Sequence, residues 1–237
     1  LANAGKGLET GTHRRFTQVI AEALPQARVA ALSGPSHAEE VARGVPTSVI
    51  SASEDIGTAE EVQELLMNPR FRVYASDDTT GVELGGALKN VIALAAGVCD
   101  GLEVGDNTKA ALMTRGLAEI ARLGLAMGAR ADTFAGLSGM GDLIVTCGSL
   151  HSRNRRAGIL IGQGRSPEEA VRQVGTVEGY HAARSGWELA QSMGVEMPIT
   201  EQCYAVCYQG QEPREAIARL MERPRRHETE TGWKPHV

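Results

Sequence analysis

The chain has 237 residues, with 24 lysines and arginines against 29 aspartates and glutamates, and its formal net charge is −5. Hydrophobic residues make up 42% and charged residues 22%, as in an ordinary globular protein, which excludes a disordered or fibrous chain. Aromatic residues are only 4% and the charge balance is mildly acidic. The chain therefore has neither a basic field nor stacking rings for nucleic acid, and we expect no nucleic-acid partner.

The four cysteines, Cys99, Cys147, Cys203 and Cys207, show no CxxC pair and no zinc-ligand spacing, so we expect idle thiols and no metal. The longest apolar stretch, residues 91–99, is much shorter than the roughly 20 residues that span a bilayer, so we expect no membrane insertion. The first residues do not resemble a secretory signal, which favours a cytoplasmic protein. They also lack an initiator methionine, which suggests processing or a fragment.

Short β-rich runs alternate with helical patterns between residues 12 and 76, which predicts αβ units around a mostly parallel sheet. Strands are predicted at residues 28–32, 47–51 and 72–75. Ser36 and Glu39 have the spacing of a capping box, so a helix is predicted to start there, after a turn at Gly34. Such turns bind ligands in α/β sheets, although an ordinary capped loop fits the pattern equally well.

Strand signals end after residue 76, and helical patterns continue to the charged end of the chain. We therefore expect an α/β part over residues 1–77, followed by an all-helical part over residues 78–237. The predicted helix at 82–99 contains only three polar residues, so it should be buried on most sides. Further helices are predicted at 107–127, 151–162, 179–193, 201–208 and 213–222, with another capped by Ser166, and the tail beyond Arg223 is expected to fray.

Lys89 lies in the middle of this apolar helix. Its amine either reaches out to water along an apolar surface or sits in a poorly hydrated site, where burial lowers the pKa of a lysine. In the second case Lys89 is a candidate general base, and Asn90 is a candidate donor to a substrate oxygen.

A glycine-rich run at 136–146 is the second candidate cluster. Asp142 and Thr146 are four residues apart, so on a helix they share one face, where they address a polyol or orient a neighbouring amine. Arg153 offers a fork for phosphate or carboxylate, with Ser152 and Asn154 as neutral donors beside it. A solvated basic turn is the alternative interpretation of this segment.

Two further residues are weaker candidates. Lys6 lies between two glycines that permit close approach of an anion, although the spacing is not that of a P-loop. Glu178 precedes Gly179, where it either accepts hydrogen bonds from ribose hydroxyls or serves the N-terminus of the following helix.

Seven segments of the sequence belong together: K-G-L-E at 6–9, S-G-P-S-H-A-E-E at 33–40, E-L-G-G-A-L-K-N-V at 83–91, G-L-S-G-M-G-D-L-I-V-T-C at 136–147, S-R-N-R at 152–155, V-E-G-Y at 177–180 and G-V-E-M-P-I-T-E at 194–201. Together they closely resemble the bacterial type of NAD(P)-dependent glycerol-3-phosphate dehydrogenase. They occur in the family's order and extend over nearly the whole chain. The resemblance implies the C-terminal part of a Rossmann-like domain followed by a helical substrate domain.

The resemblance also implies a reaction, in which hydride moves between NAD or NADP and C2 of glycerol 3-phosphate, giving dihydroxyacetone phosphate for the synthesis of phospholipids. Lys89 corresponds to the catalytic base, with Asp142 orienting it. The matched substrate contacts are Lys6, Gly34, Ser36, Lys89, Asp142, Ser152, Arg153 and Asn154, to which the residue analysis adds Asn90 and Thr146. The matched cofactor positions are Lys6, Ala38, Arg153 and Glu178.

The glycine-rich G-x-G-x-x-G turn with which the family begins is absent from this sequence. We therefore expect that this chain lacks the family's N-terminal segment. Without that segment, the chain should bind cofactor poorly, have low or no activity, and expose apolar sheet edges. The partners expected are a small phosphorylated triol or ketone and, for the parent enzyme, a second copy in a homodimer.

Two alternatives stay open. The first is a related two-domain dehydrogenase of the 6-phosphogluconate or 3-hydroxyacid type, against which the S-G-P-S and S-R-N-R motifs argue. The second is an inactive helical association module, in which Lys89 and the glycines serve only close packing of helices.

Overall fold

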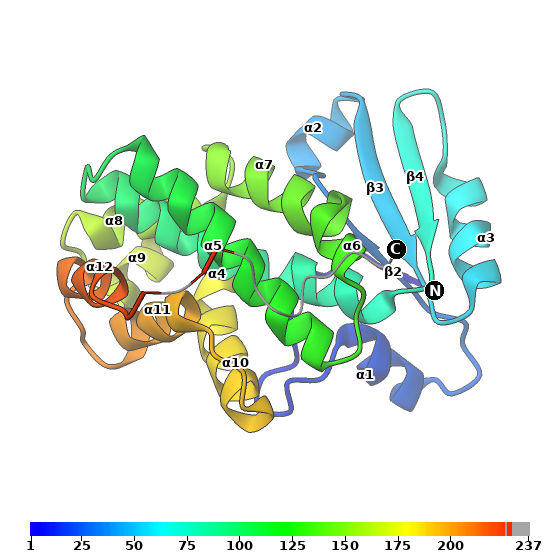
Figure 1. The fold of residues 1–237 in the computed structure, drawn as a ribbon. Helices are drawn as coiled ribbons and strands as arrows, with labels where there is room; N and C mark the ends of the chain where they lie inside the picture. Colours follow the sequence, from blue (N-terminus) through cyan, green and yellow to red (C-terminus); the bar gives the residue numbers. More distant parts are fainter. Residues whose placement is uncertain (226, 229–237) are drawn as a thin grey trace.

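The computed structural model describes residues 1–225, 227 and 228. A small sheet with its flanking helices lies at one end, and a larger group of helices forms the rest (Figure 1). Within these residues, the four strands occur before residue 77 and every element after it is helical. The chain is therefore an α/β part followed by an all-helical part, as its sequence predicts. The end of the expected helical part and most of its charged tail lie outside the described residues.

The strands form one sheet in the order β1-β2-β3-β4. They are β1 (Ala2–Asn3), β2 (Ala30–Ser33), β3 (Thr47–Ala52) and β4 (Phe71–Ser76). The last three agree with the three predicted strands, whereas β1 is too short to leave a pattern. Pairings β1–β2 and β3–β4 are parallel, but β2–β3 is antiparallel. The sheet is thus mixed, because the connection between β2 and β3 has no helix long enough to cross over the sheet.

Three helices accompany the sheet: α1 (Phe16–Ala23), α2 (Ala38–Ala42) and α3 (Ile56–Leu66). The predicted capping box at Ser36 and Glu39 is wrong, because α2 has His37 as its N-cap and begins at Ala38, with no side-chain cap from the described residues. The hydroxyl of Ser36 instead donates to the carbonyl of Gly34 at 2.9 Å. That bond holds the turn before the helix rather than the helix itself.

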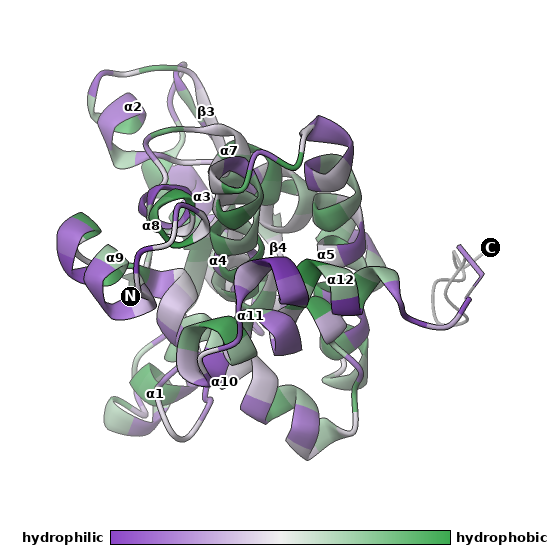
Figure 2. Ribbon diagram, turned by 90° about the vertical axis from the view of Figure 1, so that its left-hand side faces the viewer, coloured by the Kyte–Doolittle hydropathy of each residue, from purple (hydrophilic) through white to green (hydrophobic). Residues whose placement is uncertain are grey.

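The long helix α4 (Thr79–Gly101) is the centre of the helical part, and it extends the predicted helix by a few residues at each end. Figure 2 shows it with α5, α7, α8 and α10 around it. By length and composition α4 could cross a membrane, a property that the short stretch at 91–99 did not reveal. However, 89% of its apolar window is buried inside the molecule, so α4 is a core helix.

The remaining helices are α5 (Asp106–Ala126), α6 (Ala131–Ala135), the π-helix η1 (Leu137–Gly141), α7 (Asp142–Gly148), α8 (Arg153–Gly162), α9 (Pro167–Val174), α10 (Glu178–Met193), α11 (Pro198–Tyr208) and α12 (Pro213–Met221). Most of them pack on α4, while α9 packs on α8 and α12 packs on α11. Ser166 caps α9 as predicted, accepting from the backbone N–H of Glu169. The short elements α6, η1 and α7 had no predicted ranges, since their glycine-rich sequence has no clear helical period.

Helices α4 and α8 pack with their backbones in contact. A Cβ at Gly158 would lie 2.0 Å from the carbonyl oxygen of Leu94 and 2.8 Å from the nitrogen of Val98. We expect Gly158→Ala to lower the free energy of unfolding by about 3 kcal/mol, because α8 must move away from α4. Gly148→Ala is the control, since no described atom lies within 4 Å of a Cβ there. Equal urea midpoints for the two variants would contradict this packing.

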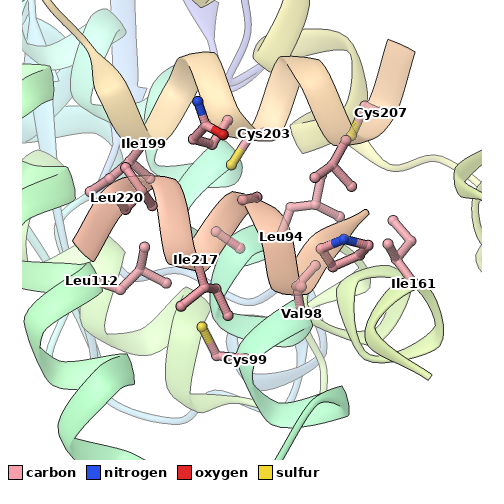
Figure 3. Close-up of a pocket in the computed structure, with 15 residues that line it drawn as sticks. Leu94, Val98, Cys99, Leu112, Ile161, Ile199, Cys203, Cys207, Ile217 and Leu220 are labelled. Atoms are coloured by element: carbon pink, nitrogen blue, oxygen red, sulfur yellow. The ribbon is translucent and has the colours of Figure 1, made fainter. Parts of the chain in front are cut away.

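An apolar cavity of about 50 Å³ lies between α4, α5, α8, α11 and α12 (Figure 3). Its walls include the thiols of Cys99, Cys203 and Cys207. Burial raises the pKa of Cys99 to about 11 and that of Cys207 to about 12, so these free thiols stay protonated near neutral pH. The walls carry no charged side chain among the described residues, so this cavity is unsuited to a phosphorylated ligand.

Candidate active site

Lys89 is buried in the middle of α4, with only 5% of its surface exposed. The interpretation in which its amine reaches out to water is therefore wrong. Nζ donates to Thr146 Oγ1 at 2.9 Å and forms an ion pair with Asp142 Oδ1. Asp142 and Thr146 share one face of α7, as their spacing predicts, and this face is turned toward the lysine. A buried amine held by a carboxylate and a hydroxyl suits a group that transfers protons.

The π-helix η1 leads directly into α7 and so places Asp142 at the first position of α7. The carboxylate is 1% exposed. Its Oδ1 faces Lys89, and its Oδ2 accepts from Lys6 Nζ at 2.8 Å. One carboxylate thus lies between two lysine amines that are far apart in the sequence, one in the loop after β1 and the other in the middle of α4. A π-helix at this point agrees with the frequent occurrence of such turns at functional sites.

Lys6 reaches this carboxylate from the loop between β1 and α1. Its Nζ also donates to the carbonyl of Gly34 at 2.7 Å and to Ser36 Oγ at 3.3 Å. The side chain is 20% exposed against 6% for that of Lys89, so Lys6 lies on the solvent side of the shared carboxylate. The structure thereby joins three separate predictions, the G-K-G turn, the S-G-P-S turn and the glycine-rich run around Asp142, in one place.

Burial lowers the pKa of Lys89 from 10.5 to about 8, because the ammonium loses its hydration. The Asp142 carboxylate acts in the opposite direction and favours the ammonium, while the positive charge of Lys6 adds to the lowering. Near neutral pH, Lys89 therefore converts readily between its charged and neutral forms. With both lysines charged, the two amines and one carboxylate carry a net positive charge that attracts an anion.

The turn after β2 brings additional polar groups to the site. Gly34 has a φ of 115°, a left-handed conformation that favours glycine. Within the described chain, the hydroxyls of Ser33 and Ser138 and the Nε2 of His37 are buried without a hydrogen-bond partner. Buried polar groups usually find partners. Their position around this turn and in η1 fits a polar ligand that lies against the loop and satisfies them.

Asn90 and Asn154 form a second buried layer beside Lys89. Asn154 Nδ2 donates to Asn90 Oδ1 at 2.9 Å, and its Oδ1 accepts from the N–H of Gly179 at 2.8 Å. The hydroxyl of Ser152 caps α8 by accepting from Arg155 N at 3.2 Å. All three residues were predicted as donors to a ligand. In the structure the two asparagines link α4, α8 and α10, and Ser152 caps α8.

Arg153 and Glu178 form an ion pair of 2.8 Å at the start of α8 and α10. Both side chains are partly exposed, at 46% and 36%. The run is thus partly solvated, as the alternative interpretation of a solvated basic turn has it, but Arg153 also has a specific carboxylate partner. A guanidinium in this position can exchange or share that partner with a bound anion.

Sequence reasoning did not propose Ser33, His37 or Ser138 as site residues. Ser33 and His37 flank the turn at Gly34, and Ser138 lies inside the glycine-rich run, so their neighbourhood was the available signal. The rings of His37 and His151 lie 6.1 Å apart, which brings the start of α2 close to the loop before α8. Among the described residues no group of histidine, cysteine, aspartate or glutamate could hold a metal ion.

A sheet part and a helical part that meet at a buried lysine–carboxylate pair and a polar turn fit the class of NAD(P)-dependent two-domain dehydrogenases. Family models identify the member of this class. The model of the NAD-dependent glycerol-3-phosphate dehydrogenase C-terminus matches residues 78–218, and that of its N-terminus matches residues 1–59. The chain belongs to the NAD-dependent glycerol-3-phosphate dehydrogenase family.

Comparison with individual relatives supports the same family. The chain is 57% identical over 229 residues to a glycerol-3-phosphate dehydrogenase [NAD(P)+] of Clostridium perfringens, an alignment that covers 96% of this chain and 69% of the relative. It is 59% identical over 233 residues to the enzyme of the same name from Moorella thermoacetica, covering 98% and 69%. The crystal structure of glycerol-3-phosphate dehydrogenase from Coxiella burnetii superposes with a TM-score of 0.89 at 42% identity, covering 94% of this chain and 68% of that one.

Proposed function

We propose that the protein interconverts sn-glycerol 3-phosphate and dihydroxyacetone phosphate by hydride transfer with NAD or NADP. The observation that carries the proposal is the contact of Lys6, Asp142 and Lys89, because it unites three family motifs around one buried amine. Residues 1–77 are the remaining part of the dinucleotide-binding domain, and residues 78–237 are the substrate domain.

Lys89 is the proton-transfer group. In the oxidation direction its neutral amine takes the proton of the C2 hydroxyl, and in the reverse direction its ammonium returns that proton. Asp142 orients the amine, and Thr146 accepts its second hydrogen bond. Since the pKa of Lys89 is about 8, oxidation should speed up as pH rises through this value, and reduction should slow down.

Substrate and cofactor share the space around these groups. The nicotinamide cofactor supplies the hydride donor or acceptor when it is bound. Its binding residues are Lys6, Ala38, Arg153 and Glu178, with the unpartnered hydroxyls around the Gly34 turn as further contacts. Substrate contacts are Lys6, Gly34, Ser36, Asn90, Thr146, Ser152, Arg153 and Asn154, in addition to the catalytic Lys89 and Asp142.

The cationic groups explain the preference for a phosphorylated substrate. Arg153 binds the phosphate by its guanidinium fork, and Lys6 adds positive charge on the solvent side of Asp142. We further propose that the enzyme works in the cytoplasm, supplies glycerol 3-phosphate for phospholipids, and forms a homodimer. The family membership leaves the helical association module without support as the role of the parent protein.

The test is a substrate panel followed at the absorbance of the reduced cofactor, with both NADH and NADPH. It is carried out on the 237-residue chain and on the same chain extended by the family's N-terminal segment. We expect oxidation of the cofactor with dihydroxyacetone phosphate and none of comparable efficiency with ketones derived from 6-phosphogluconate or 3-hydroxyacids. Preference for one of the other two classes would refute the substrate assignment.

A further inference from the structure

Glu83 is a buried carboxylate in α4 that the proposed chemistry does not use. It is 6% exposed. Its Oε1 accepts from the backbone N–H of Thr17 at 2.9 Å, and its Oε2 accepts from the Thr17 hydroxyl and from Arg15 Nη1 at 3.0 Å. All of its partners belong to the start of α1. Glu83 therefore fixes the N-terminus of α1 to the central helix.

The start of α1 is in turn joined to the loop that carries Lys6. Arg15 forms an antiparallel backbone bridge with Leu8, two residues after Lys6. Phe16 lies beneath the loop, since a Cβ at Gly5 or Gly7 would meet its ring at 3.2–3.3 Å. A displacement of α1 would thus be transmitted to the loop by its backbone and by an aromatic ring.

The central helix α4 also supports Lys6 at two positions beyond Glu83. Glu83, Gly86 and Lys89 follow one another at intervals of three residues, slightly less than one helical turn. The stem of Lys6 lies next to Gly86, where a Cβ would come within 3.6 Å of Lys6 Cγ. The Lys6 amine then meets Asp142, which also binds Lys89. One helix therefore anchors the loop, supports its lysine and carries the proton-transfer group.

We propose that Glu83 is a positioning residue: through Arg15 and Thr17 it holds the Lys6 loop on α4 and so keeps the Lys6 amine on Asp142. The inference on placement stands on the contacts alone, and only its kinetic consequence rests on the proposed function. The two parts are tested by separate readouts.

Placement is tested by acetylation of native protein with acetic anhydride, followed by mass spectrometry of the lysine-containing peptides. Lys109 is the internal reference, because its side chain is 23% exposed against 20% for Lys6 and it is also held by a carboxylate, that of Asp100. We expect Glu83→Gln to raise the ratio of Lys6 to Lys109 acetylation about tenfold, since the charged hydrogen bonds that hold the loop are weakened.

The matched control is Glu119→Gln. Glu119 is also a buried carboxylate, and it accepts from the backbone N–H groups of Ile199 and Thr200 at the start of α11. This variant should lower the melting temperature without changing the acetylation ratio. If Glu83→Gln fails to fold, Thr17→Ala decides instead, with an expected increase of about threefold. An unchanged ratio in the folded variant overturns the proposal.

The kinetic readout is a double-mutant cycle with Lys6→Ala. Glu83→Gln should lower kcat/KM for glycerol 3-phosphate about tenfold in the wild type and less than about twofold when Lys6 is already replaced. Equal losses in both backgrounds would mean that Glu83 acts on general stability, not through Lys6. These rates are measured on the chain extended by the family's N-terminal segment, and absence of turnover there would refute the proposed function and leave the acetylation result as the test of placement.

Discussion

Replacing Lys89 by methionine should lower kcat for both reaction directions about a thousandfold and leave the fold intact. The magnitude follows from the usual contribution of a positioned acid or base. Methionine fills similar apolar space in α4, and Asp142 keeps Lys6 as its partner, so the carboxylate does not become an isolated buried charge. Initial rates with dihydroxyacetone phosphate, and with glycerol 3-phosphate in the reverse direction, measure the effect.

Lys109→Met is the matched control for this prediction. Lys109 is likewise paired with a carboxylate, at 2.9 Å from Asp100, but it lies on α5 and takes no part in the site. Its replacement should change kcat less than about twofold, because this partly exposed ion pair makes no contact with the Lys89–Asp142 pair. A Lys89→Met variant with the circular dichroism spectrum of the wild type and near-full activity would exclude Lys89 as the proton-transfer group.

Asp142→Asn should lower kcat/KM about a hundredfold and shift the pH dependence of glycerol 3-phosphate oxidation to lower pH. The asparagine removes the negative charge that favours the Lys89 ammonium, while Lys6 and burial continue to oppose it. The pKa of Lys89 therefore falls further below about 8, and its neutral form is reached at lower pH. The variant should also have a melting temperature several degrees lower, because the two lysine amines lose the carboxylate that lies between them.

Thr146→Val distinguishes the effect of the Asp142 charge from that of a neutral hydrogen bond to Lys89. It removes the other hydrogen-bond acceptor of Lys89 on the same face of α7 but no charge. We expect a smaller loss of activity than in Asp142→Asn and little displacement of the pH profile. The two-lysine arrangement would be wrong if the asparagine variant kept the wild-type profile, or if the valine variant moved it equally.

Much of the fold follows from sequence patterns of sufficient length. The nearly apolar run around Lys89 predicts a central buried helix, and the change of texture after residue 76 predicts that the strands end there. The two-residue strand β1 and the helices α6 and α7 left no such pattern. The antiparallel β2–β3 pairing was missed because the direction of a strand depends on the path of its connection, which residue periodicity does not encode.

For the site, spacing predicted that Asp142 and Thr146 share a face and left open whether they address a polyol or orient an amine, and the structure places the Lys89 amine there. The contact of Lys6 with Asp142 joins residues 136 positions apart, which a single sequence cannot indicate without the family resemblance. The error at Ser36 has a related cause. Its hydroxyl fits a capping box, yet the long-range contact with Lys6 and the bond to Gly34 use it instead.

The most direct test of the central claim is to follow deuterium from reduced cofactor labelled at nicotinamide C4 into the product of dihydroxyacetone phosphate reduction. We expect glycerol 3-phosphate with one deuterium at C2, formed by the wild-type enzyme and not measurably by Lys89→Met. Product without deuterium at C2, or equal incorporation by both proteins, would contradict a site in which Lys89 moves the proton that accompanies hydride transfer.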